Sequence, residues 1–462
     1  MAELLIFRKS NQNYPKNATD YIFIRCTACN GPASFLVNFQ NQQHMSLHLR
    51  AGNLSSCLIL SFALTLFSCH KQVSAPAVDT PLNLPPGSTA VTSSTNQFAF
   101  SLLHSILQHE PTGANELISP FSIYMALSMT YNGAAGPTRD SMAVALQQSG
   151  IPVSQLNTVS QALISQLPKE DSKVQLSVAN AIWYAKNIAQ PSSTFLNTIQ
   201  QDYLGTMQSL DFTQPASVNT INTWVAKNTN NKIPAILDQV PSNTAMVLVN
   251  AVYFNGVWRN AFDPNQTRDM PFTLADGNTI STPFMTREMT IRANFGPSFA
   301  IAELPYSTGK GFNMYLVVPN DKNRSITDFA ASFNLDTLTS AWARLDSTPV
   351  GLWIPKWEYA YSIPNLKTEL TALGMGLAFG NADFSNMFSG ESVNISQVAH
   401  KAYIKVSEEG TEAAAATGVV VRITASPVIP ALFADHPFLY LITEKQTGTV
   451  LFIGFVTNPS VN

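Results

Sequence analysis

The side chains that could catalyse a reaction are few in this 462-residue chain, and they form no known catalytic pattern. The sequence has no HExxH, no Walker loop and no GxSxG, and the glycines of LGMGLAFG (373–380) miss the GxGxxG spacing. His104 and His109 are five residues apart, which does not place them on one helix face for a metal. His400 lies beside an expected strand and is interpreted as a buried hydrogen-bonding residue. We therefore expect no enzyme, no metal site and no cofactor.

The thiol groups are confined to the front of the chain, at Cys26, Cys29, Cys57 and Cys69. A disulfide-stapled core or a thiolate nucleophile is thus excluded beyond residue 69. Cys26 and Cys29 form a CxxC pair without a second pair or a strand–helix context, so a metal or redox role there is a weak alternative.

Residues 45–69 have the layout of an export signal. Arg50 precedes an apolar run from 57 to 67, which is too short to span a bilayer and has the length of a signal core. The sequence LFSC (66–69) resembles a lipoprotein signal, with Cys69 as the lipidated residue; an ordinary cleaved secretory signal is the alternative. We expect an exported, extracellular or cell-surface protein held to the membrane only through lipid. Residues 1–44 are interpreted as an artefact of start-site choice.

The remainder divides into a tether over residues 70–93, rich in Pro, Ser and Thr, and one large unit over 94–462. Charged residues are 12% of the chain and the net charge is −3, which gives no electrostatic footprint for nucleic acid. Helices are predicted at 123–131 and 220–229, and strands at 174–184, 245–254, 313–318 and 402–406, with a terminal hairpin at 438–443 and 450–456. Long strands between blocks of helix indicate an α+β fold with large mixed or antiparallel sheets.

The segment EEGTEAAAATGVVV (408–421) is the most unusual part of the sequence. Alanine favours helix, but glycines flank the run and three valines follow it. With the period of two of a strand, one face collects small or apolar, uncharged residues, namely Thr411, Ala413, Ala415, Thr417, Val419 and Val421. The opposite face carries Glu412 and Arg422. Such a segment could enter a β-sheet without burying a charge.

These features resemble the serpins, the serine-protease-inhibitor family. EEGTEAAAAT is similar to the family's reactive-loop hinge: Glu408, Glu409, Gly410, Thr411, Glu412, Ala413, Ala414, Ala415, Ala416 and Thr417. LVNAVYFNGVW (248–258) is similar to LVNAxYFxGxW, with Asn255 where lysine is common. LISPFSI (117–123), INTWV (221–225), ADFS (382–385), HKA (400–402), DHPF (435–438) and GFVTNP (454–459) also match. The resemblance covers about residues 94–459.

The resemblance implies an inhibitor that acts as a suicide substrate. A protease cleaves the exposed loop, and after acylation the loop inserts into the main sheet as a new strand and traps the enzyme covalently. The implied partners are elastase-, subtilisin- or trypsin-like serine proteases, with papain-like cysteine proteases as a further class, and a monomer is expected. Sheet opening would be controlled by Ser119, Ser122, Asn250, Trp258, Lys356 and His400, with an ion pair between Lys356 and Glu408.

The reactive bond is placed between Thr424 and Ala425. The family's usual loop length counted from Gly410, and a count back from His436, both reach this bond. Cleavage after Arg422, before Ile423, is the alternative for a trypsin-like protease. A non-inhibitory serpin acting as a binding or carrier lipoprotein is the second hypothesis for the whole chain; it would tolerate charged or bulky inward hinge residues, and this hinge has none.

Overall fold

The computed structural model describes residues 80–109, 114–390, 392–411 and 429–461, and the backbone of four short strands before residue 80. Two units are distinguished, Met1–Pro76 and Ala77–Asn462. In the first, β1 (Ile6–Phe7), β2 (Tyr21–Arg25), β3 (Ser34–Gln40) and β4 (His44–Leu47) form an antiparallel sheet in that order. Cys69 and the expected signal core lie outside the described residues.

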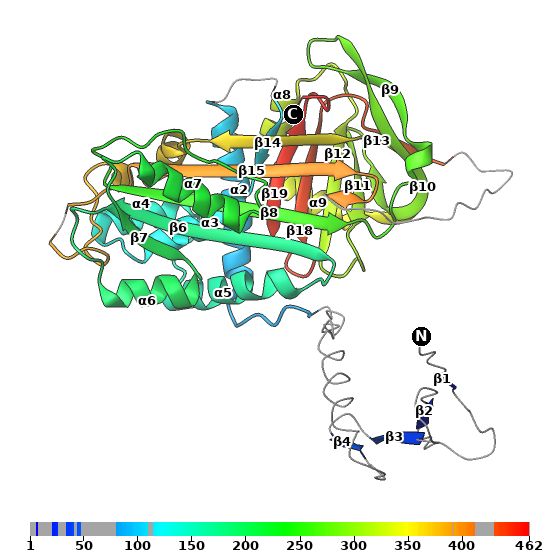
Figure 1. The fold of residues 1–462 in the computed structure, drawn as a ribbon. Helices are drawn as coiled ribbons and strands as arrows, with labels where there is room; N and C mark the ends of the chain where they lie inside the picture. Colours follow the sequence, from blue (N-terminus) through cyan, green and yellow to red (C-terminus); the bar gives the residue numbers. More distant parts are fainter. Residues whose placement is uncertain are drawn as a thin grey trace. The chain divides into compact units, whose positions relative to one another are not determined.

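The second unit combines helices with two large sheets (Figure 1). Its helices are α2 (Ser88–Leu107), α3 (Pro120–Tyr131), α4 (Gly136–Ala145), α5 (Val153–Gln166), α6 (Ser193–Asp202), α7 (Ala216–Asn228), α8 (Ile326–Ser332), α9 (Leu335–Ala343) and α10 (Lys367–Leu370). Short helical turns are η1 (Leu167–Lys169), η2 (Pro264–Gln266), η3 (Thr371–Met375) and η4 (Gly376–Phe379). Within the described part, no helix is long and apolar enough to cross a bilayer.

The six-stranded sheet has the order β14-β15-β16-β8-β6-β7. Its strands are β6 (Val174–Ala185), β7 (Thr206–Leu210), β8 (Met246–Val257), β14 (Trp357–Ile363), β15 (Gln397–Ser407) and the two-residue β16 (Gly410–Thr411). Strand β8 is antiparallel to β6 and parallel to β15. β16 is antiparallel to both of its neighbours, so it runs between two parallel strands.

The nine-stranded sheet has the order β17-β13-β10-β11-β12-β18-β19-β5, with β9 paired to β10. Its strands are β5 (Glu116–Ile118), β9 (Arg268–Thr273), β10 (Thr279–Phe295), β11 (Phe299–Pro305), β12 (Phe312–Pro319), β13 (Asp346–Pro355), β17 (Ala431–Phe433), β18 (Phe438–Glu444) and β19 (Val450–Val456). The expected helices at 123–131 and 220–229, the expected strands and the terminal hairpin are confirmed, with ends shifted by a few residues.

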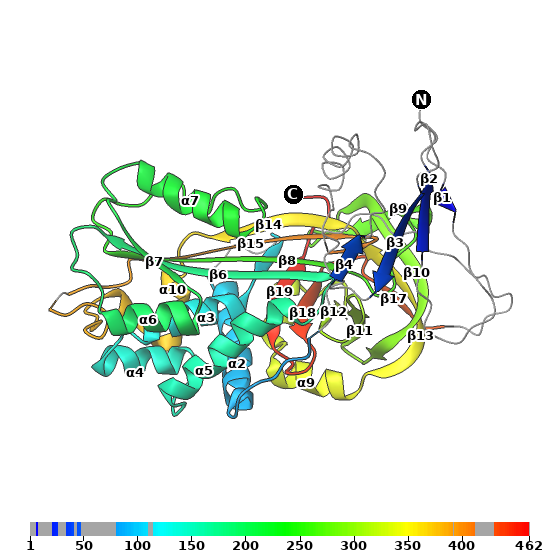
Figure 2. The same ribbon diagram turned by 60° about the horizontal axis from the view of Figure 1, so that its bottom comes forward.

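Alternation along the strands of the six-stranded sheet decides which helices cover which face. Ile182 and Leu248 face the main core, whereas Trp183 and Val249 face the opposite side, where α7 packs with Ile221 and Val225. Figure 2 shows α7 on one side of this sheet and α2 and α3 on the other. A strand that enters this sheet must therefore fit beneath α7 and above the main core.

Two expectations about the chain's organisation are corrected. Helix α2 begins at Ser88, so residues 88–93, assigned to the tether, form the first turns of a packed helix in which Val91 is fully buried. Burial of one face offsets the helix-weakening Ser and Thr residues there. The same helix ends at Leu107, so His109 lies beyond it; its Nδ1 contacts the Ser105 carbonyl at 2.7 Å.

Candidate functional site

The space between β8 and β15 is the centre of the candidate site. The two strands pair directly at residues 247–251 with 397–401. At their other end β16 separates them, because Gly410 pairs with Val257 and Ser407, and Thr411 pairs with Gly256 and Val406. Between these stretches, the described ladder gives residues 252–255 and 402–405 no direct pairing with each other. The sheet is thus parted at one end and closed at the other.

Strand β16 is the beginning of the segment predicted to insert. Gly410 and Thr411, the third and fourth residues of the hinge, are already buried in the sheet. Thr411 is 1% exposed, and its hydroxyl lies 2.7 Å from the hydroxyl of the buried Tyr306. Hydrogen bonding to two strands and burial of Thr411 favour this docked position over the solvated one. Glu412 and residues 413–417 lie outside the described residues.

Gly410 fits this position because it lacks a side chain. Its φ of 153° belongs to the region that side chains rarely adopt. A Cβ there would lie 2.1 Å from the Gly256 carbonyl oxygen and 2.6 Å from the Val257 Cα. Both are backbone atoms of β8, which is held by its pairing with β6. A glycine is therefore required where β15 turns back to become β16.

The turn that joins β15 to β16 is held by N–H groups of Trp258 and Phe262, which follow the end of β8. The backbone N–H of Trp258 donates to the Glu409 carbonyl at 2.8 Å, and that of Phe262 donates to the Glu408 carbonyl at 2.7 Å. The indole N–H of Trp258 donates to the Ser407 carbonyl at 2.9 Å. Trp258 also stacks on Tyr306 with ring centroids 4.6 Å apart. Trp258 thus connects the end of β8 to the turn at the start of the hinge.

The expected ion pair is formed at the same turn. Lys356 Nζ lies 3.0 Å from Glu408 Oε2, and the Thr267 hydroxyl donates to Glu408 Oε1 at 2.7 Å. Burial raises the pKa of Glu408, but the Thr267 hydroxyl, the residue's own backbone N–H and Lys356 outweigh burial and hold the pKa below its usual value. Glu408 is therefore ionised at neutral pH.

A row of three buried polar side chains crosses the closed end of the sheet, and we call it the polar row: Asn180, Asn250 and His400. In register, Asn250 lies opposite both Asn180 and His400. Its amide Nδ2 donates to Asn180 Oδ1 at 2.7 Å, and its Oδ1 lies 2.8 Å from His400 Nδ1. The polar row therefore bridges β8 to β15 at the place where an entering strand would separate them.

The first turn of α3 anchors the polar row from below. The backbone N–H of Ser119 donates to His400 Nε2 at 3.2 Å, so Nδ1 carries the proton and donates to Asn250. The Ser119 hydroxyl caps α3 and donates to the Leu451 carbonyl at 2.7 Å, while Asn250 Nδ2 also donates to the Ser122 hydroxyl. Burial lowers the pKa of His400 to about 3, so this histidine is neutral at physiological pH.

The structure thus gathers the sequence-predicted residues into two groups. Trp258 and Lys356 lie at the parted end with the hinge, and Ser119, Ser122, Asn250 and His400 lie at the closed end. Sequence reasoning missed Asn180 and Tyr306. Asn180 could have been found as a polar residue in the apolar run VQLSVANAIWY (174–184), whereas Tyr306 had no local signal. The bonds Thr424–Ala425 and Arg422–Ile423 lie outside the described residues.

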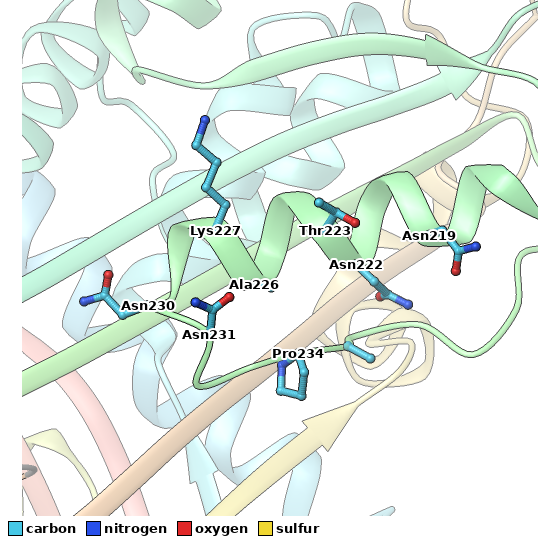
Figure 3. A pocket seen from close by; sticks show the side chains of 9 residues that line it. Asn219, Asn222, Thr223, Ala226, Lys227, Asn230, Asn231 and Pro234 are labelled. Atoms are coloured by element: carbon cyan, nitrogen blue, oxygen red, sulfur yellow. The ribbon is translucent and has the colours of Figure 1, made fainter.

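Helix α7 and the segment that follows it cover the outer face of the sheet. Asn222 joins them: its Nδ2 donates to the Leu237 carbonyl at 2.8 Å, and its Oδ1 accepts from the N–H groups of Ile236 and Leu237. Lys401 on β15 donates to the Ala235 carbonyl at 2.9 Å. A hollow of about 700 Å³, lined mostly by polar residues, lies between α7 and this segment. Figure 3 shows the side chains that line it. Widening the sheet requires this cover to shift.

The chemistry available here is conformational. Among the described residues, no group of three or more His, Cys, Asp or Glu could hold a metal ion. What the arrangement provides is a sheet parted at one end by β16, a neutral hydrogen-bonded row across its closed end, and a cover formed by α7 and the segment that follows it.

The comparisons with known proteins agree with this geometry. A family model described as "Serpin (serine protease inhibitor)" matches residues 93–459. An uncharacterized serpin-like protein of Methanosarcina acetivorans is 33% identical over 380 residues, 80% of this chain and 86% of the relative. The leukocyte elastase inhibitor of Bos taurus is 32% identical over 381 residues, 80% of this chain and 99% of the relative.

Solved structures show the same architecture. Tengpin, a thermophilic serpin in its native state, superposes with a TM-score of 0.75 at 29% identity, covering 82% of this chain and 97% of tengpin. Human thyroxine-binding globulin complexed with its hormone gives a TM-score of 0.74 at 28% identity, covering 81% of this chain and all of the globulin. With a family model over most of its length and relatives of 32–33% identity over 80% of it, this chain belongs to the serpin family.

Proposed function

We propose that this serpin inhibits proteases as a suicide substrate. A protease would cleave the segment between β16 and β17 and remain attached as an acyl-enzyme, while the segment continues from β16 into the sheet. The observation that carries the proposal is the docked β16: Gly410 and Thr411 already lie between β8 and β15, in line with residues 252–255 and 402–405, which do not pair with each other.

The direction of Thr411 supports insertion of the residues that follow. Its side chain points to the core and contacts Tyr306. Because side chains alternate along a strand, residues 413, 415 and 417 would share this inward face, and they are Ala, Ala and Thr. Each added residue extends the ladder with hydrogen bonds worth about 0.5–1.5 kcal/mol net each. Insertion therefore stabilises the sheet without burying a charge.

The test is incubation with a protease panel of elastase, subtilisin, trypsin and papain, followed by denaturing electrophoresis. A stable band at the summed mass of serpin and protease is expected. Cleavage of the serpin without any such band, for every protease, would contradict inhibition.

Matched variants test insertion itself. Ala413→Glu would place an unpaired charge on the inward face at a cost of several kcal/mol, so insertion should slow and the variant should be cleaved as a substrate. Ala414→Glu carries the same charge on the opposite face, where the sequence itself has Glu412, and should impair trapping less. Equal trapping by both variants would refute the mechanism.

We propose Thr424–Ala425 as the reactive bond, because two counts along the sequence agree on it. Thr424 preceded by Ile423 suits elastase-, subtilisin- or papain-like pockets. Cleavage after Arg422 would shorten the inserting segment by two residues, about 6.6 Å of strand, and should give more turnover by trypsin-like enzymes. Mass mapping of the released C-terminal fragment decides: a start at Ala425 supports the assignment, and a start at Ile423 with efficient trapping of trypsin contradicts it.

Export with a lipid anchor at Cys69 remains our proposal for localisation, from the signal-like residues 45–69. Mass spectrometry of membrane-extracted protein should show a mature chain that begins at a lipidated Cys69. A soluble product with another N-terminus would contradict it.

The carrier alternative has one specific observation in its favour, the likeness to thyroxine-binding globulin in complex with its hormone. The same electrophoresis distinguishes the two functions, because a carrier forms no covalent complex with a protease.

A further inference from the structure

Two stacked aromatic side chains, the exposed Phe433 and the half-buried Trp353, form a platform at the edge of the nine-stranded sheet. Trp353 on β13 and Phe433 on β17 lie opposite each other in parallel register, and their rings stack with centroids 4.4 Å apart at 20°. Phe433 is 42% exposed, one of the few large apolar side chains of the described part that face solvent. We call this pair the aromatic platform.

Residues next to the aromatic platform fix the orientation of its two rings. A Cβ on Gly351 would lie 2.5 Å from the Trp353 ring, so the absence of a side chain at 351 lets the indole lie flat on the sheet. The backbone N–H of Gly351 donates to the Pro430 carbonyl, and that of Ala434 donates to the Trp353 carbonyl. Both hydrogen bonds fix β17 against β13 and hold the two rings in register.

The platform lies next to the point where the cleaved segment rejoins the fold. Strand β17 is an edge strand of its sheet and pairs with β13 (Figure 2). The described chain resumes at Ile429, two residues before β17. From the proposed reactive bond to Pro430 the chain has five residues, which span at most about 18 Å. For the alternative bond after Arg422 the limit is about 25 Å.

A protease that attacks either bond is therefore held within this distance of β17. A domain of about 200 residues has a radius of gyration of about 16 Å, equivalent to a body about 40 Å across. The surface of the protease thus extends about 20 Å to each side of its active site. This radius is similar to the maximum distance of about 18–25 Å between the scissile bond and β17. The platform is on the primed side, where residues after the scissile bond leave the cleft.

We propose that the aromatic platform is a second contact surface for the target protease, which receives an apolar side chain from the rim of the protease cleft on the primed side. The inference rests on the proposed inhibitory function. Exposed aromatic side chains are the residues that contribute most to binding when an interface covers them. The platform adds affinity to the encounter before acylation and plays no part in strand insertion, because it belongs to the other sheet.

The experiment compares Phe433→Ala with Phe295→Ala. Phe295 is a matched control: the same residue type, 40% exposed, in the same sheet, but at the end of β10 that pairs with β11. The second-order rate constant of covalent complex formation is measured with the fastest-trapped protease among elastase, subtilisin, trypsin and papain. The stoichiometry of inhibition and the thermal unfolding midpoint are measured alongside, and Phe433→Tyr serves as the conservative variant.

Phe433→Ala is expected to lower the rate constant about tenfold with unchanged stoichiometry, because truncation of a large aromatic contact weakens the encounter complex by about that factor. Phe295→Ala and Phe433→Tyr should stay within twofold of the parent protein. A rate constant that is unchanged in Phe433→Ala, or lowered equally in both alanine variants, overturns the platform while leaving inhibition intact. Absence of any covalent complex with the unaltered protein overturns the proposed function instead.

Discussion

Replacing Gly410 by alanine tests whether the docked hinge depends on the missing side chain. The new Cβ would overlap the Gly256 carbonyl oxygen at 2.1 Å, more than 1 Å closer than ordinary contacts. Relief would require movement of β8, which is paired with β6 along most of its length. We therefore expect Gly410→Ala to release β16 from the sheet and leave the rest of the fold in place.

The free energy at stake follows from the contacts that β16 makes. Its side-chain hydrogen bond from Thr411 to Tyr306 and about three ladder bonds, at about 1 kcal/mol each, give about 4 kcal/mol. Fixing two backbone residues costs about 1–2 kcal/mol each, about 2–4 kcal/mol together, which leaves at most about 2 kcal/mol net. The variant's unfolding midpoint should therefore fall by only a few degrees.

Hydrogen exchange followed by mass spectrometry is the direct assay. Peptides that contain residues 406–411 should lose protection in Gly410→Ala, whereas peptides from β6 should not change. Gly277→Ala is the matched control: its φ is also positive, at 83°, but a Cβ there meets nothing within 4 Å. Protection of the hinge that persists in Gly410→Ala would refute the steric argument, and the same loss in Gly277→Ala would show that the effect is not local.

Two further predictions concern stability. Asn222→Ala removes three hydrogen bonds that hold residues 236–237 to α7. It should lower the free energy of unfolding, measured in urea, by about 2–3 kcal/mol. Asn219 is exposed on the same helix, so Asn219→Ala should change this free energy little. Burial and the neighbouring Glu444 raise the pKa of Glu170 to about 9. The folded state then keeps a proton that the unfolded chain releases near pH 4.5, so stability falls as the pH rises from about 4.5 to 9. Glu170→Gln should flatten this decline and raise the unfolding midpoint at pH 8; identical pH profiles would contradict the assignment.

The sequence predicted most of the fold where a local pattern carried the information. Apolar periodicity and turn residues, which lie within a few positions of each other, predicted several elements: α3, β6, β8, β12, β15 and the terminal hairpin. The start of α2 was placed too late because Ser and Thr dominate its first turns, and only packing of residues such as Val91 against the core explains a helix there.

The sequence also predicted the hinge and most of the polar residues around the sheet, since a motif names residue types at fixed spacing. It did not determine that Gly410 and Thr411 are already docked. That position depends on Gly256, Trp258 and Tyr306, which are 104 or more residues away along the chain and meet the hinge only in the folded protein.

Cross-strand neighbours show the same limit. Asn180, Asn250 and His400 are polar residues of three separate strands, and nothing local indicates that the three share one row. Strand order and register, which are properties of the whole sheet, place them side by side. The sequence by itself determined which segment could enter a sheet without burying a charge; tertiary structure decided where that sheet is open and what holds it closed, because both depend on contacts between strands that are distant in the chain.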